Sequence, residues 1–291
     1  MSKTIAAQVP KKRSQLKEVW KRLAKNRLAV VGLVVLLLII FLAIFAETIA
    51  PFNYAYQNHD ATFQTPNRTH LFGTDSFGRD ILSRVIFGTR SSLQIGFISL
   101  VVGAAIGCLL GAIAGFFGGW IDMLIMRFND ILMTIPRIVL AIAIASALGT
   151  GLTNAILALS ISSIPNFVRV VHASTMTIKD QEYVEAARCI GAKNPRIIRR
   201  YVFPNVLAPI IVQATLGVGT TIILAAALSF LGLGIQPPTP EWGAMLSAAR
   251  LHMRDFPHMV LFPGLAIMIT VLALNWFGDG LRDALDPKLK K

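Results

Sequence analysis

The sequence has few charged residues for its length. Asp, Glu, Lys and Arg make up 15% of its 291 residues, whereas soluble domains carry about 25%. Hydrophobic residues account for 54%, and several apolar runs approach or exceed the roughly 20 residues that a helix needs to cross a bilayer. Alternating strands of about ten residues, which a membrane barrel requires, do not occur. The predicted fold class is therefore an all-α polytopic membrane protein.

Motifs of redox, metal and nucleotide chemistry are also missing. The two cysteines, Cys108 and Cys189, give no disulfide framework. The five histidines show no metal-ligand spacing, and there is no Gly-x4-Gly-Lys-Ser/Thr loop. No serine or cysteine–histidine nucleophile arrangement is evident. We therefore expect no catalytic residues, no metal site and no nucleotide hydrolysis by this chain itself.

Acidic residues are outnumbered by basic ones, 15 to 28, which gives a net charge of +13. Nine of the basic residues precede the first apolar run, and seven lie between Arg169 and Arg200. Because they flank apolar runs, they indicate membrane orientation and argue against a nucleic-acid partner. The first run, 28–46, is too long for a typical signal peptide, so an uncleaved first span is expected.

Six transmembrane helices are expected, and an even number places both termini on one side of the bilayer. The expected spans are 28–49, 91–117, 121–148, 152–171, 204–233 and 258–277. The basic segments lie in the N-terminal arm, the 169–200 region and the tail, which predicts that both termini are cytoplasmic. The predicted organisation is a basic cytoplasmic arm (1–27), a first span (28–49), an extracytoplasmic loop (50–90), a five-helix core (91–282) with a cytoplasmic loop (172–203), and a cytoplasmic tail (283–291).

Glycines recur every four residues in the second expected span, at Gly103, Gly107, Gly111 and Gly115. They fall on nearly one stripe of a helix, which allows another helix, in the same bundle or in a partner, to approach closely. The third expected span contains Pro136, and near its start Arg127 and Asp130 are spaced to pair on one helix face. In the 50–90 loop, Asp75 and Asp80 are expected to form a turn network tied by Arg79 rather than a cation site.

Deeply placed charge is scarce in the expected spans, whereas ion-coupled pumps usually need ionisable groups near mid-membrane. The polar groups in the middles of the spans are expected to be neutral only. Four of these groups are candidates for lining a translocation path: Gln213, Thr220, Ser229 and Asn275. Energy for transport must then come from another subunit, or flow must be passive.

The basic loop over 172–203 has the pattern of two short helices. Asp180 or Thr177 can cap the first helix, and Gly191 suits the left-handed position past its end. Asn194-Pro195 favours the start of the second helix, and Pro204 marks the beginning of the fifth span. In the first helix, Glu185 offers a charge to a partner, while Ala186 and Ala187 keep the helix slim enough for a cleft. An ordinary amphipathic loop remains the alternative.

The order Glu185-Ala186-Ala187, Gly191 and Tyr201-Val202-Phe203-Pro204 resembles the signature of permease subunits of binding-protein-dependent ABC importers. That family usually has Ile and Leu where Tyr201 and Phe203 stand. The resemblance implies a type I ABC importer permease fold. It also implies that six residues couple the chain to an ATPase: Tyr183, Glu185, Ala186, Ala187, Gly191 and Pro204.

Longer stretches are similar to the second (C-type) permease subunit of dipeptide and oligopeptide importers, a subfamily that also serves glutathione and nickel or metal chelates. They are 71–75 (LFGTD), 78–84 (GRDILSR), 229–234 (SFLGLG), 236–243 (QPPTPEWG) and 278–287 (GDGLRDALDP). The resemblance implies a multi-pass protein of the bacterial inner membrane. Its implied partners are a second homologous permease, two ATP-binding subunits that use ATP and Mg, and an extracytoplasmic substrate-binding protein.

Di- or oligopeptides are the first expectation for the substrate. Glutathione or a modified peptide comes second, and nickel or a metal chelate third. A stand-alone channel or secondary transporter, which would need an inverted repeat or mid-membrane ionisable groups, is an alternative function. A membrane scaffold without a transport path is another.

Overall fold

The computed structural model describes residues 15–285, and these residues are helical apart from turns and one long loop. The first part of the predicted basic arm (1–14) and most of the predicted tail (286–291) lie outside the described residues. The helices are α1 (Gln15–Leu23), α2 (Arg27–Ile44), α3 (Ala46–Ile49), η1 (His59–Ala61), α4 (Ile81–Phe117), α5 (Gly119–Thr134), α6 (Arg137–Leu148), α7 (Leu152–Lys179), α8 (Glu182–Cys189), α9 (Asn194–Ile197), the π-helical turn η2 (Ile198–Val202), α10 (Phe203–Phe230), α11 (Trp242–Ala249) and α12 (His258–Leu285).

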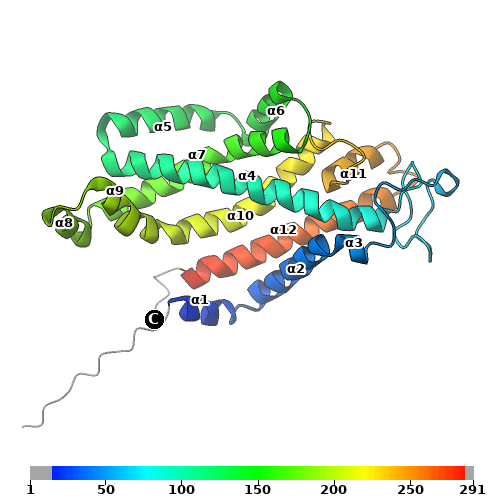
Figure 1. Cartoon of the computed structure of the whole chain (residues 1–291), viewed down its shortest axis with the longest axis horizontal. Helices are drawn as coiled ribbons and strands as arrows, with labels where there is room; N and C mark the ends of the chain where they lie inside the picture. The colour runs from blue at the N-terminus through cyan, green and yellow to red at the C-terminus, as the bar shows by residue number, and fades with distance from the viewer. Residues whose placement is uncertain (1–14, 286–291) are drawn as a thin grey trace, which may run out of the picture.

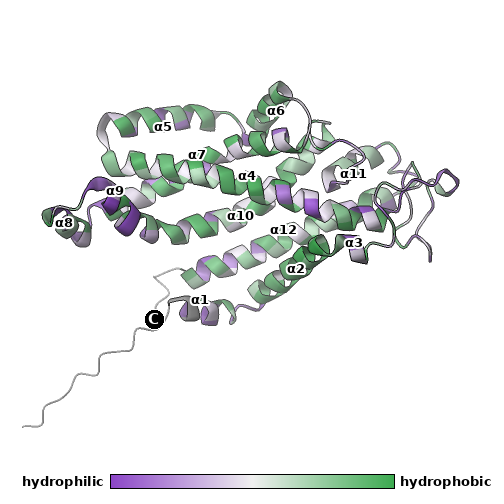
Figure 2. Cartoon of the chain, in the orientation of Figure 1, coloured by the Kyte–Doolittle hydropathy of each residue, from purple (hydrophilic) through white to green (hydrophobic). Residues whose placement is uncertain are grey.

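Five long helices, α2, α4, α7, α10 and α12, run along the long axis of the molecule (Figure 1). The loop after α3 and the short helix α11 lie at one end of this bundle, and α8 and α9 lie at the other. Both described ends of the chain, α1 and the end of α12, lie at the same end as α8. Apolar residues dominate the long helices, whereas hydrophilic residues gather in the end loops and around α8 and α9 (Figure 2).

Five helical stretches in the described residues are long and apolar enough to span a membrane, and α5 with α6 makes a sixth if the bent pair is one span. The expectation of one continuous third helix over 121–148 is wrong, because α5 and α6 meet at a bend of 92°. Pro136 causes the break. It has no N–H to continue the ladder, and its ring disfavours a helical conformation for Ile135, which has ψ 123°.

Other helices run further than the sequence predicted. α4 begins ten residues before its expected span, α7 continues to Lys179, and α12 continues to Leu285. The segment from Asn194 to Phe230 is a single helical stretch of 37 residues, and within it α10 begins at Phe203, so Pro204 lies where the fifth span was expected to start. Pro204 is tolerated because it lies in the first turn of α10, directly after the π-helical turn.

The glycine stripe of α4 packs against α7 within the same chain. A Cβ at Gly107 would lie 2.5 Å from Cβ of Phe167 and 2.8 Å from the carbonyl oxygen of Ile164. At Gly111 it would lie 2.5 Å from the carbonyl oxygen of Val168. Real Cβ atoms cannot approach so closely, so glycine is what allows the two backbones to pack at this distance. The prediction of close helix packing is confirmed, and the neighbour is α7.

Polar side chains of α5 and α7 meet at two places. The Asp130 carboxylate lies 3.1 Å from Arg169, and Asp122 lies 2.9 Å from His172. The expected pair of Arg127 and Asp130 on one face of α5 does not form, because the carboxylate turns to the neighbouring helix. Both contacts place α5 beside α7 before the chain bends into α6.

The loop before α4 is organised by buried charges, as the sequence predicted. Nε of Arg79 donates to Oδ2 of Asp75 over 2.7 Å, and the Asp75 carboxylate also accepts the backbone N–H groups of Phe77 and Arg79. Asp80 caps the start of α4 by accepting from the backbone of Ser83 at 2.8 Å, and His70 lies 2.9 Å from the same carboxyl group. The loop is thus fixed to the helix that it precedes.

Candidate functional site

The first short helix of the basic loop forms where it was expected, over Glu182–Cys189. Gly191 follows with φ +82°, the left-handed conformation that glycine adopts most easily. The expected cap is wrong: Asp180 ends α7, and the residue before α8 is Gln181, whose side chain makes no capping bond. Asn194 begins the second short helix with Pro195 in its first turn, in agreement with the sequence.

α8 has one face on the bundle and one face outward. Val184 is 0% and Ala187 3% exposed, and both belong to the main hydrophobic cluster. Tyr183, Glu185 and Ala186 are exposed. Ala186 and Ala187 were both expected to lie on the outward face and keep it narrow. This is wrong for Ala187, whose methyl group is buried against the rest of the chain.

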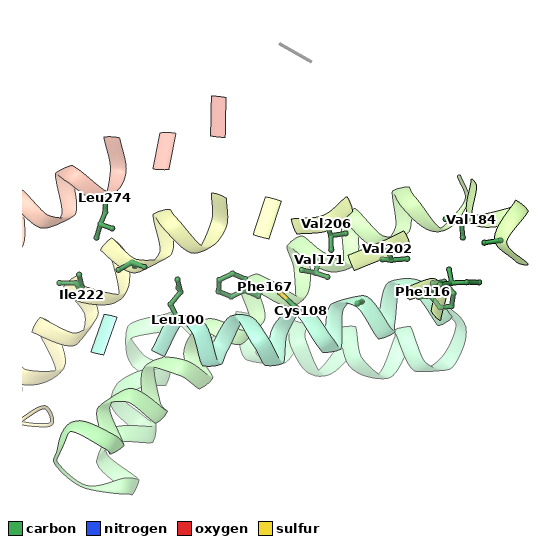
Figure 3. Close-up of a cluster of buried hydrophobic side chains, with 14 of the residues drawn as sticks. Leu100, Cys108, Phe116, Phe167, Val171, Val184, Val202, Val206, Ile222 and Leu274 are labelled. Atoms are coloured by element: carbon green, nitrogen blue, oxygen red, sulfur yellow. The ribbon is translucent and has the colours of Figure 1, made fainter. Parts of the chain in front are cut away.

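The hydrophobic cluster behind α8 reaches far into the bundle. It includes Phe116 at the end of α4, Val202 at the end of η2, Val206 at the start of α10, and Phe167 of α7. Figure 3 follows the cluster from Val184 and Phe116 at one end to Ile222 and Leu274 at the other. Interiors packed in this way transmit displacement with little compression. α8 is thus joined to the middle of the bundle by contiguous packed side chains.

Two of the four predicted path residues line a common cavity. This cavity has a volume of about 220 Å³ and lies between α4, α6, α7 and α10. Gln213 and Thr220 of α10 line it, together with Ser163 and Asn166 of α7. Its apolar lining includes Leu100, Phe167 and Leu216. The lining combines apolar side chains with convergent polar groups, as is common in small-molecule sites.

The structure does not bring the other two predicted path residues into this cavity. Ser229 is 4% exposed and lies near the end of α10, where a Cβ added to Gly234 would meet it. Asn275 of α12 lies beside Gly219, its Oδ1 3.8 Å from where a Cβ of that glycine would be. Neither residue lines the cavity.

Ser163, Asn166 and Arg137 line the cavity without having been predicted as path residues, and Arg137 is the charged one. It is the first residue of α6, directly after the bend, and it is the one charged side chain among the described residues that line the cavity. Its Nη2 donates to Oγ1 of Thr221 over 3.0 Å, and its Nη1 donates to Oγ1 of Thr220 over 3.4 Å. Its Nε–H is buried and has no hydrogen-bond partner in the described part of the chain.

A signal for Arg137 was present in the sequence. The other basic residues lie in the arm, the loops, the tail or at the ends of apolar runs, but Arg137 lies inside the run expected to span as one helix. The statement that the middles of the spans hold only neutral groups is therefore wrong at this position. An ionisable residue within a span is costly and marks a functional site by default.

These features define an integral membrane protein whose helical bundle carries a partly open polar cavity between its helices and an exposed helix at one end. Residues 107–291 match the family of the binding-protein-dependent transport system inner membrane component. Residues 14–66 match the N-terminal transmembrane domain of oligopeptide transport permease C. The chain belongs to this family of ABC importer permeases and is a multi-pass component of the bacterial inner membrane.

Curated relatives match over nearly their whole length. The dipeptide transport system permease protein DppC of Alkalihalophilus pseudofirmus is 50% identical over 277 residues, covering 95% of this chain and 91% of the relative. The glutathione transport system permease protein GsiD of Escherichia coli is 49% identical over 274 residues, covering 94% and 90%. An inward-facing structure of the MetNI methionine ABC transporter has the same fold, with a TM-score of 0.59 at 20% identity over 71% of this chain and 98% of that chain.

Proposed function

We propose that this chain forms half of the translocation path of an ATP-driven importer for dipeptides or oligopeptides. A second homologous permease would supply the other half, and an extracytoplasmic binding protein would deliver the substrate. Two separate ATP-binding subunits would hydrolyse ATP with Mg, since this chain has no phosphate-binding loop. The substrate class rests on the dipeptide permease relative. The glutathione permease relative makes glutathione the second candidate, and a nickel or metal-chelate substrate comes third.

The observation that carries this proposal is the two-sided packing of α8. Its outward residues, Tyr183, Glu185 and Ala186, are free to contact a partner, whereas Val184 and Ala187 are buried in the chain. A partner that moves α8 therefore acts on the packed cluster that also holds the start of α10. α10 lines the cavity further along its length. ATP-driven closure of the partner subunits would in this way alter access to the cavity.

Gly191 and Pro204 have different roles in this proposal. Gly191 lets the chain reverse after α8 and is not itself buried. Its N–H donates to the carbonyl of Arg188 over 2.9 Å, and no neighbour lies within 4 Å of where a Cβ would be. Pro204 is exposed beside the π-helical turn. π-helical turns often occur at functional sites, and we propose that this one is the point at which α10 responds to α8.

The proposal is tested by charge reversal at Glu185 and by proline at Gly191. Glu185→Arg and Gly191→Pro should abolish substrate-stimulated ATPase activity of the assembled transporter while leaving membrane insertion intact. Gly232→Pro is the matched control, because Gly232 has φ +81°, no neighbour within 4 Å of a Cβ, and an equivalent N–H bond to Ser229 over 2.9 Å. Gly232 lies at the other end of α10, so this variant should retain stimulation. Wild-type uptake in both Glu185→Arg and Gly191→Pro would refute the proposal.

A stand-alone secondary transporter is less well supported. Arg137 is an ionisable residue within the bundle, but a guanidinium stays protonated and does not relay protons. Uptake by the purified chain alone in liposomes without ATP would favour this alternative.

A further inference from the structure

We propose that Arg137 is the anion-binding residue of the cavity and that it holds a carboxylate of the transported substrate during passage. The proposal rests on the importer function proposed above and names the chemical group that the path recognises. Peptides carry a C-terminal carboxylate, and glutathione carries carboxylates as well, so the inference covers the first two substrate candidates. A bare divalent cation is disfavoured by a fixed positive charge at this place.

The first support is the charge of the cavity. Of the nine lining residues, Arg137 alone is charged, and none is Asp or Glu. Arg137 also takes part in none of the ion pairs found among the described residues, in contrast to Arg79, Arg90 and Arg169. A buried or partly buried cation is normally paired. The missing counter-charge can be supplied by a substrate anion.

The second support is the hydrogen bonding of the guanidinium. Arg has five N–H donors, and the described chain takes one bond from Nη1 and one from Nη2. The threonine hydroxyls that accept these bonds donate in turn to the carbonyl of Gly217, over 2.9 and 2.8 Å. Thr220 and Thr221 therefore fix the side chain without neutralising it. The unpartnered Nε–H leaves the guanidinium short of an acceptor, and carboxylates are the acceptors that its fork geometry fits best.

The third support is the placement of neutral polar groups around the same space. The amides of Asn166 and Gln213 line the cavity from α7 and α10. Amide side chains both donate and accept, so they can bind the peptide group next to the carboxylate. The bend at Pro136 is what directs the start of α6, and hence Arg137, to α10 instead of continuing along α5.

The first experiment measures the charge preference of the cavity without any substrate. The transporter, assembled with its partner subunits in nanodiscs, carries Gln213→Cys in a Cys189→Ser background, and the parent without Gln213→Cys gives the background rate. The introduced thiol is labelled with an anionic (ethylsulfonate) or a cationic (ethyltrimethylammonium) methanethiosulfonate. We expect the anionic-to-cationic rate ratio to fall by about tenfold when Arg137→Gln is added, since a unit charge a few Å away acts strongly at low effective dielectric. Arg169→Gln, the same change outside the cavity, should leave the ratio within about twofold.

The second experiment measures transport of dialanine by proteoliposomes supplied with the binding protein and ATP. Arg137→Gln should lower uptake by about tenfold, and Arg137→Lys, which keeps the charge, should restore at least about a third of it. If Arg137 acted only as a strut between α6 and α10, Arg137→Lys, whose ammonium cannot reproduce the two guanidinium bonds to Thr220 and Thr221, would restore little of the uptake. An unchanged labelling ratio, or unchanged uptake in Arg137→Gln, overturns the inference. A wild-type transporter that shows the charge preference but no ATP-driven peptide uptake would refute the proposed peptide function while leaving the anion site in place.

Discussion

Gly107→Ala adds one methyl group at a place where the backbones of α4 and α7 pack closely. The new Cβ would lie 2.5 Å from Cβ of Phe167, 2.8 Å from the carbonyl oxygen of Ile164 and 3.2 Å from the backbone nitrogen of Val168. Optimal contacts between carbon atoms are about 3.5–4.0 Å. Two of the three neighbours are backbone atoms and the third is fixed to the backbone, so no side-chain rotation relieves the contact. The helices must separate by roughly 1 Å.

The expected cost is the difference between two effects. Overpacking of a well-packed interior lowers the free energy of unfolding by about 1–3 kcal/mol. Replacing glycine by alanine within a helix raises it by about 0.5–1 kcal/mol. Gly219→Ala is the matched control, because Gly219 is also a helix glycine buried within the chain. Its Cβ would have neighbours at 3.5 Å or more, which is ordinary van der Waals contact. Both variants gain the same helix propensity, so this contribution cancels when they are compared. Gly107→Ala should therefore be less stable than Gly219→Ala by about 1–3 kcal/mol.

The assay is thermal unfolding of the purified transporter in nanodiscs, followed by the loss of this subunit from the assembled complex. For large domains, 1 kcal/mol corresponds to about 2–4 °C in Tm, so Gly107→Ala should lower the midpoint by several degrees relative to Gly219→Ala. Equal midpoints for the two variants would show that α4 and α7 are not in direct backbone contact, and the reasoning would fail.

Two further predictions concern charged side chains at the end of the bundle opposite α8, with thermal unfolding again as the measurement. Asp75→Ala leaves Arg79 and Arg84, each 5% exposed, without their carboxylate at 2.7 and 3.7 Å, and should cost about 3–5 kcal/mol. Asp60→Ala, an exposed position in the same loop, should cost little, and a similar loss in both variants would contradict this. Arg90→Met removes bonds to the carbonyl oxygens of Ala43 and Ile44 as well as to Glu47, whereas Glu47→Ala removes only an exposed ion pair, worth about 0–1 kcal/mol. Arg90→Met should therefore be the more destabilising by about 1–2 kcal/mol, and equal effects would show that Arg90 does not hold the end of α2.

Composition and spacing by themselves determined much of this protein. The apolar runs predicted the position of every long helix. A segment that crosses a bilayer needs about 20 apolar residues, and a helix makes all of its backbone hydrogen bonds internally. Gly191 predicted that the chain reverses direction after α8, because the backbone conformation that glycine allows depends on that residue alone. The four-residue repeat from Gly103 to Gly115 predicted a close helix contact, because side-chain direction in a helix depends only on position. The resemblance in 185–204 predicted the importer family. The cytoplasmic location of the termini stays a prediction.

Only the tertiary structure decided which partners these local features meet. The glycine stripe could have faced another subunit, and its packing on α7 depends on contacts distant in sequence. Asp130 had a local partner in Arg127 but binds Arg169 of α7. Ala187 turns inward because α8 docks on the bundle. Arg137 reaches Thr220 and Thr221, more than eighty positions away, because the chain bends at Pro136. Spacing in sequence encodes which residues share a helix face, whereas the identity of the facing helix is set by the packing of the whole bundle.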